Sequence, residues 1–171
     1  ALGTGSRAVF AIVATHLAAS AGALTWSAIE WYTRGKPSVL GFISGAIAGL
    51  GTITPAAGFV MPWHGLVIGV IAGLVCYFAC TWLKQKLKYD DSLDVFGIHG
   101  IGGMLGMLMA GVFATGTLTA TKTDPAGING LMGGNPKLLG IQLAGVLVTI
   151  IWCIIGTYIA LKITQLCCGL R

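Results

Sequence analysis

An aspartate and a histidine stand close together in a stretch of the chain that is otherwise apolar or small. The stretch DVFGIHG places Asp94 five residues before His99, and no further charged residue follows until Lys122. A neutral imidazole offers one hydrogen-bond donor and one acceptor. Ionisable groups inside membranes mark pathways, proton relays or counter-ions. We therefore expect His99 to face the interior of a helix bundle and to act there, with a structural hydrogen bond as the ordinary alternative.

Three other ionisable residues have simpler interpretations. Asp94 is placed to cap the N-terminus of the helix that carries His99, where a carboxylate also suits the helix dipole. His16 lies in the middle of an apolar segment, and a hydrogen bond between helices is the expected role for it. His64 follows a Pro-Trp pair in a segment that we interpret as a solvated external loop.

No set of residues has the pattern of an enzyme or of a metal site. Cys76 and Cys80 lie one helical turn apart, but the chain lacks the Cys-x-x-Cys spacing and the neighbouring histidines of a zinc site. Asp90 and Asp91 stand among lysines rather than in a pocket. Without a nucleophile–base pair or a phosphate-binding loop, we expect no enzymatic activity. We also expect no metal and no cofactor.

The composition indicates that a membrane surrounds these residues. Hydrophobic residues make up 56% of the 171, and charged residues only 9%, whereas about 25% of a typical soluble domain is charged. The net charge of +5 comes from basic residues that are scattered in clusters along the chain. Nucleic-acid binding proteins gather such residues on one face, so we exclude nucleic acid and expect a lipid bilayer as the partner.

Five segments are apolar enough to span that bilayer, which takes about 20 residues per helix. The predicted fold class is therefore an all-α polytopic membrane protein with five transmembrane helices. Thr54-Pro55 and Pro62-Trp63 interrupt a long uncharged region and divide it into two spans, of which the first is short. The predicted spans are residues 8–31, 37–54, 63–83, 93–115 and 138–166.

The distribution of Lys and Arg predicts the orientation, since cytoplasmic loops are richer in both. Lys162 should reach toward the richer side from within the last span. Six basic residues lie on that side and three on the other: Arg34, Lys36, Lys84, Lys86, Lys88 and Arg171 against Arg7, Lys122 and Lys137. The N-terminus of this chain should then lie outside and its C-terminus in the cytoplasm. Because the chain begins with Ala1 and shows no signal peptide, we expect an N-terminal portion to be missing.

Glycines recur at a spacing of four residues in three of the predicted spans, which places each set on one helix face. Small residues in this pattern let neighbouring backbones approach closely. We expect tight helix packing from all three sets, and the pattern alone does not indicate a passage. The sets are Gly41, Gly45 and Gly49; Gly65, Gly69 and Gly73; and Gly102, Gly106 and Ala110.

Several of these motifs together resemble the C-terminal half of the ammonium transporters of the Amt/Mep/Rh family. The resemblance covers essentially the whole chain, and Phe96-Gly97 between the acid and the histidine is similar to the Amt/Mep branch. The motifs are KPS at residues 36–38, SGAIAGL at 44–50, TPA at 54–56, DVFGIHG at 94–100 and GLR at 169–171.

The resemblance implies a fold of eleven membrane helices in which two inverted five-helix halves enclose a pore. The five spans would be helices seven to eleven, with the first pore histidine and the external binding site in the missing half. It further implies a homotrimer in the plasma membrane, ammonium or ammonia as substrate with methylammonium as an analogue, and a cytoplasmic regulatory protein as a partner. His99 matches the second pore histidine and Asp94 the family's acid, while Ser44, Ile47, Thr54 and Val95 fall near the conduction path.

Two other functions remain open at this point. The same family contains ammonium sensors and non-conducting subunits, and nothing in the sequence separates these from transporters. A bis-histidine haem protein is the other alternative, because His16 and His99 belong to different helices. At 1.5 Å per residue, His16 would lie about 13 Å from the outer end of its span and His99 about 9 Å from the inner end of its own. In a core about 30 Å thick the two differ in depth, which disfavours a shared iron.

Overall fold

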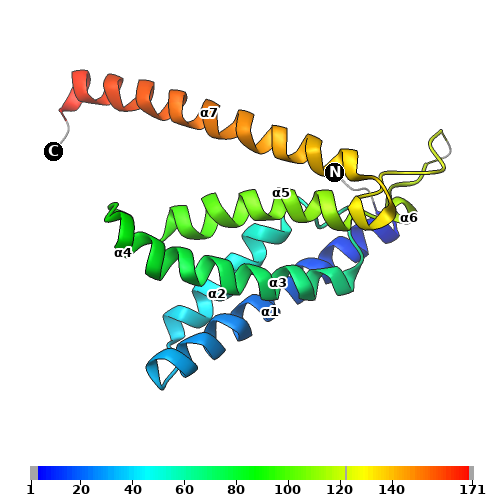
Figure 1. Cartoon of the computed structure of the whole chain (residues 1–171), viewed down its shortest axis with the longest axis horizontal. Coiled ribbons are helices and arrows are strands. Elements are labelled where there is room, and N and C mark those ends of the chain that lie inside the picture. Colours follow the sequence, from blue (N-terminus) through cyan, green and yellow to red (C-terminus); the bar gives the residue numbers. More distant parts are fainter. Residues whose placement is uncertain (1–3, 122, 170–171) are drawn as a thin grey trace.

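The computed structural model describes residues 4–121 and 123–169, and the part of the chain that it describes folds into helices without strands (Figure 1). Ala1, Lys122, Leu170 and Arg171, which entered the expectations above, lie outside the described residues. In chain order the elements are α1 (Ser6–Arg34), α2 (Val39–Ile53), α3 (Pro62–Phe78), η1 (Ala79–Leu83), α4 (Lys84–Leu87), η2 (Phe96–Ile101), α5 (Gly102–Phe113), α6 (Gly116–Thr119), η3 (Leu131–Gly133) and α7 (Pro136–Cys168).

Four of the helical segments are long and apolar enough to cross a membrane, by length and composition alone. They are Ser6–Arg34, Pro62–Leu87, Phe96–Phe113 and Pro136–Cys168. The fifth apolar helix, Val39–Ile53, has 15 residues and is about 22 Å long at 1.5 Å per residue, less than a hydrocarbon core of about 30 Å. The chain thus has the all-helical, polytopic fold of a membrane protein.

Helices α1 and α2 cross at glycines, whose lack of a side chain lets the two backbones approach closely. A Cβ added at Gly45 would collide with the carbonyl oxygen of Gly22, and one added at Gly49 would collide with that of Ala18. Gly41 differs from these two, because the space beside it holds the carboxylate of Glu30. The expected close packing of this set is confirmed, and its first member makes room for a buried acid.

The glycines of α3 pack against the same region of α1. Gly65 lies against the backbone of Ala14, Gly69 against that of Ala18, and Gly73 against Thr25. Ala18 is completely buried and lies between the glycines of α2 and those of α3. The expected packing of this second set is therefore also confirmed, and α1, α2 and α3 form one tightly packed unit.

Helix α5 joins this unit through its own small residues. Gly102 and Gly106 lie against Thr52 of α2, and Ala110 is buried, which confirms the packing of the third set. On its other side, Gly111 of α5 contacts Leu139 at the start of α7. Beyond that contact α7 runs along one edge of the bundle and diverges from the other helices toward its C-terminus (Figure 1). Only Val146 of α7 is buried.

The start of α3 differs from what the sequence predicts. We expected His64 in a solvated loop, but it lies in the first turn of α3 and is only 6% exposed. Its Nδ1 accepts a hydrogen bond from the backbone N–H of Met61 at 3.1 Å, and its ring packs between Trp63 and Phe113. Pro62 at the first helical position favours this helix start, so the Pro-Trp pair begins a helix instead of marking a loop.

A buried acid holds the connection between α1 and α2. Glu30 is 3% exposed, and its Oε2 accepts hydrogen bonds from the backbone N–H and the hydroxyl of Ser38. Arg34 lies 3.4 Å from Oε1 of the same carboxylate. Ser38 in turn caps α2 by accepting a hydrogen bond from the N–H of Gly41. This network satisfies a charge that would otherwise be costly to bury.

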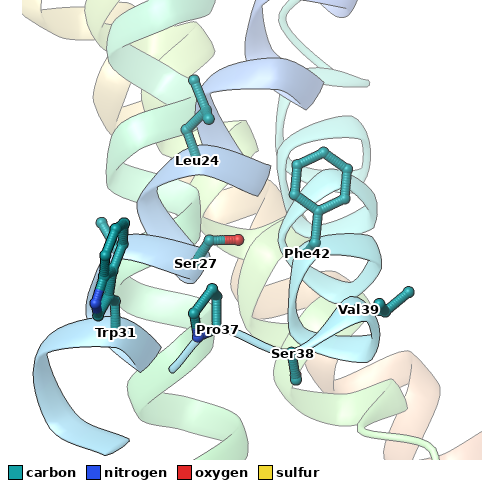
Figure 2. A pocket seen from close by; sticks show the side chains of 8 residues that line it. Leu24, Ser27, Trp31, Pro37, Ser38, Val39 and Phe42 are labelled. Carbon is teal, nitrogen blue, oxygen red and sulfur yellow. The ribbon is translucent and has the colours of Figure 1, made fainter. Parts of the chain in front are cut away.

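An apolar groove lies beside this network, between the last turns of α1 and the first turns of α2 (Figure 2). Trp31 stands on one side of it and Phe42 on the other, with Ser27 between them. The hydroxyl oxygen of Ser27 is buried and has no hydrogen-bond partner among the described residues. Trp31 remains 66% exposed, as expected for an aromatic ring at a membrane interface.

Candidate functional site

The helix that carries His99 begins with a cap, but the capping residue is not the one we expected. The carboxylate of Asp91 accepts hydrogen bonds from the backbone N–H groups of Val95 and Phe96, both at 2.9 Å. Asp94 has a left-handed backbone with φ of 56°, and its carboxylate points elsewhere, to Lys84 Nζ at 2.7 Å. Asp91 therefore caps the helix, and the expectation that Asp94 does so is wrong.

His99 lies in a widened turn. Residues Phe96–Ile101 form a π-helix before the regular α5 begins, and such turns are frequent at functional sites. The imidazole is exposed on the surface of this chain. It lies beside Gly51 of α2, where an added Cβ would be 3.8 Å from His99 Nδ1. The His99 ring therefore lies next to α2 at Gly51.

Three of the predicted site residues follow the same stripe of α2 as Gly51. Ser44, Ile47 and Thr54 lie seven and four residues before it and three after it, which is the spacing of one helix face. Ile47 is 38% exposed, Thr54 is exposed and Ser44 is half-buried. The Thr54 hydroxyl donates a hydrogen bond to the Leu50 carbonyl at 2.7 Å. The stripe runs past the His99 ring on both sides of Gly51.

Val95 is the predicted site residue that lies just before His99 on the same helix. It is 51% exposed and lies one turn before His99, just as Ile47 lies one turn before Gly51. Because the two helices touch at Gly51 and His99 and run in the same direction from the predicted cytoplasmic side, Val95 and Ile47 lie toward the same end of the contact. The structure thus places His99 against Gly51 of the α2 stripe and Val95 in the same hollow as His99, while Asp94 forms an ion pair with Lys84.

A surface hollow opens next to His99 on the side of the 88–94 loop. Tyr89, Asp90 and Asp91 line it together with His99. The Tyr89 ring packs edge-on against Phe96, with 5.6 Å between the ring centroids. Burial raises the pKa of the Tyr89 phenol, and the negative charge of Asp91 adds to this rise. Tyr89 is therefore neutral at physiological pH and supplies no base beside His99.

The two other histidines lie away from this surface. His16 is exposed on α1 and lines a separate hollow with Thr15 and Leu50. That hollow shares no lining residue with the one beside His99. His16 and His99 therefore line different hollows. His64 is buried in α3, as described above.

Three residues of this region were not singled out from the sequence. Gly51 is outside the four-residue glycine repeats, and only the position of His99 gives it a role. The sequence pattern predicts only a role in membrane orientation for Lys84, which in the structure forms an ion pair with Asp94. Asp91 was assigned to a loop, although the sequence Asp91-Ser92-Leu93 before the apolar run contains two good capping residues. That signal was available, since Asp and Ser are both favoured as N-caps.

Comparison with known proteins gives a consistent result over the entire chain. Residues 1–171 match the Ammonium Transporter Family. The sequence is 44% identical over 164 residues to an ammonium transporter of Bacillus subtilis (strain 168), a match that covers 96% of this chain and 39% of that protein. The chain therefore spans about two fifths of the length of this relative.

Solved structures agree with this result. The crystal structure of Saccharomyces cerevisiae Mep2 superimposes with a TM-score of 0.87 and 40% sequence identity, and the match covers 95% of this chain and 36% of that chain. A structure described as a sensor Amt protein superimposes with a TM-score of 0.81 over 98% of this chain and 39% of that chain. Its identity is 24%, so this second likeness concerns the fold alone.

Proposed function

This chain belongs to the ammonium transporter family, and from that premise we propose that it forms part of a pathway for ammonium or ammonia across a membrane. The observation that carries the proposal is the surface formed by His99 and the α2 stripe. An exposed imidazole lies there beside Gly51, Val95, Ile47 and Thr54 are exposed as well, and the helix bundle is of membrane-spanning character. We propose that this surface lines the pathway, with His99 as its central polar group.

A neutral imidazole suits this task because the cation itself is hard to move through hydrocarbon. Burying an unpaired charge in a medium of low dielectric constant costs tens of kcal/mol by idealised estimates. If ammonium releases its proton, only ammonia has to pass, and one ring nitrogen of His99 can donate to it or accept from it. The proton follows along the imidazole and its partner histidine. Potassium has no proton to release and is excluded.

The side chains around His99 fit a narrow apolar passage with few polar positions. Val95 and Ile47 exclude water on the side of the predicted cytoplasmic end, while the hydroxyls of Ser44 and Thr54 offer hydrogen bonds before and after them. Asp94 lies near the inner end of the passage with its charge balanced by Lys84. Because the Thr54 hydroxyl already donates to Leu50, its oxygen is left to accept a hydrogen bond from a substrate.

The remainder of the pathway would come from protein outside these 171 residues. We propose that the chain is the C-terminal half of a transporter domain and that a second pore histidine faces His99 from the other half. We further propose a homotrimer in the plasma membrane, with residues 84–91 in the cytoplasm and open to a regulatory protein. Methylammonium is expected to use the same route.

Uptake by the full polypeptide that contains this sequence tests the proposal. Cells without other ammonium transporters should grow on limiting ammonium and accumulate labelled methylammonium when they express it. Expressed alone, the 171-residue chain should insert but not support growth, whereas co-expression with the matching N-terminal half should restore it. Matched membrane abundance is the control in each case. Failure of the abundant, trimeric full polypeptide to take up either substrate would favour a sensor and overturn the transport proposal.

A further inference from the structure

The π-helical turn that carries His99 packs against a second π-helical segment. This second segment is η1, Ala79–Leu83, which interrupts the long helix from Pro62 to Leu87. Gly97 of η2 is buried and lies against Cys80 of η1, where an added Cβ would collide with the Cys80 sulfur. The two π-helical segments are therefore in direct contact at Gly97, two residues before His99.

The segments that flank these two elements meet through an ion pair between Lys84, the first residue of α4, and Asp94, which precedes η2. Lys84 follows Cys80 by four residues, and Asp94 precedes Gly97 by three. The distance from Lys84 Nζ to Asp94 Oδ1 is 2.7 Å, and the two side chains are 28% and 31% exposed. The pair is therefore better shielded from water than an ordinary surface salt bridge, which contributes little.

The backbone at Asp94 connects this ion pair to the helical turn that follows. Asp94 adopts a left-handed conformation with φ of 56°, which is uncommon for a residue other than glycine. Its carbonyl oxygen accepts a hydrogen bond from the N–H of Ile98 at 2.9 Å, so the residue supplies the first acceptor of the helical turn that leads into η2. A side chain held by Lys84 thus fixes the backbone from which the His99 turn starts.

We infer that Lys84 is a positioning residue: through Asp94 it sets where the His99 imidazole stands against Gly51. The inference rests on the proposed function for its effect on transport, but its effect on the ring can be measured separately. Lys84 does not touch the surface formed by His99 and the α2 stripe, and it acts only through the ion pair. Loss of the pair releases the start of the turn and lets the imidazole move.

The experiment compares Lys84→Met and Asp94→Asn, singly and combined, in the full polypeptide. Lys86→Met is the matched control, because Lys86 is on the same short helix and its ammonium group lies over the Trp82 ring, 4.7 Å from the centroid. The first readout is the rate at which diethyl pyrocarbonate modifies His99, followed by peptide mass spectrometry. The second is methylammonium uptake per folded protein.

Each single variant should change the His99 modification rate at least twofold and lower uptake at least threefold. The double variant should match the stronger single variant, because both changes break one ion pair. Lys84→Arg, which keeps the charge, should stay near wild type in both readouts. Asp94→Asn carries the modification test by itself if Lys84→Met yields too little folded protein.

The two proposals fail in different ways. If His99→Ala leaves uptake normal, the proposed function is wrong, yet a changed modification rate in Lys84→Met would still support the positioning role. If His99→Ala abolishes uptake while Lys84→Met equals Lys86→Met in both readouts, the positioning role is overturned and the proposed function stands. Multiplying effects in the double variant would also overturn it, since they would show that Lys84 acts independently of Asp94.

Discussion

Glu30 and Ser38 form a two-point contact across the turn between α1 and α2. Oε2 of the buried carboxylate accepts from the Ser38 backbone N–H at 2.8 Å and from its hydroxyl at 2.9 Å. The same hydroxyl oxygen accepts from the N–H of Gly41. One acid on α1 thus orients the residue that caps α2, and α2 carries the stripe along which His99 lies.

Replacing this acid should destabilise the fold without touching the pathway. In Glu30→Ala the N–H and hydroxyl of Ser38 lose their charged acceptor, and a hydrogen bond to a charged group contributes about 1.5 to 3 kcal/mol. We expect a lower thermal unfolding midpoint in detergent. Asp90→Ala, which removes an exposed acid, is the control and should leave the midpoint unchanged. Equal midpoints for the two variants would show that the network adds no stability.

Gly69 should not tolerate even one extra methyl group. An alanine Cβ at Gly69 would collide with the backbone of Ala18 in α1, and overpacking of this kind costs about 1 to 3 kcal/mol. Gly145→Ala on α7 is the matched control, because its added Cβ would meet nothing within 4 Å. We expect a lower yield of folded protein by size-exclusion chromatography for Gly69→Ala only. Similar yields would contradict the close helix contact.

The cap at Asp91 predicts a local effect on the helix that carries His99. Asp91→Ala leaves the N–H groups of Val95 and Phe96 without their acceptor, and loss of an N-cap costs about 0.5 to 2 kcal/mol. Amide hydrogen exchange in residues 95–101 should therefore accelerate. Asp90→Ala again serves as the control, and unchanged exchange in Asp91→Ala would remove the capping role.

His99 itself can be tested by two substitutions in the full polypeptide. At matched abundance, His99→Ala should lower ammonium flux tenfold or more, which corresponds to about 1.4 kcal/mol on a barrier, or weaken selectivity against potassium. His99→Gln keeps a donor and an acceptor but cannot carry the proton. Restored flux in His99→Gln would favour simple hydrogen bonding, and continued loss would favour proton transfer. Normal flux and selectivity in His99→Ala would exclude a role in the pathway.

The orientation can be tested with one exposed residue on each side. Ser92 is exposed in the loop before η2, and Asn135 is exposed just before α7. In a cysteine-free background, a cysteine at Ser92 should resist impermeant thiol reagents in intact cells and react after permeabilisation. A cysteine at Asn135 should react in intact cells. The reverse pattern would place the N-terminus of the chain inside.

The sequence by itself was enough to predict a polytopic all-helical membrane fold and its family. Both follow from local properties. Apolar segments that are long enough to span a membrane must satisfy their backbone hydrogen bonds within a helix. Glycines four residues apart lie on one helix face, whichever helix packs against it. Those glycines pack as expected, and the DVFGIHG stretch identifies the histidine. These features could be predicted because each depends on neighbours within a few residues of the chain.

Only the tertiary structure decided which groups meet. The sequence offers both Asp91 and Asp94 as capping residues, and the choice between them depends on Lys84, which approaches Asp94 from another helix. His64 is buried because α3 begins at Pro62 and Phe113 of α5 packs against the ring. The partner of His99 on α2 is a glycine outside any repeat, and Glu30 is satisfied by a serine beyond the turn. Such contacts depend on how helices cross, and helix crossing is set by packing between segments far apart in the sequence.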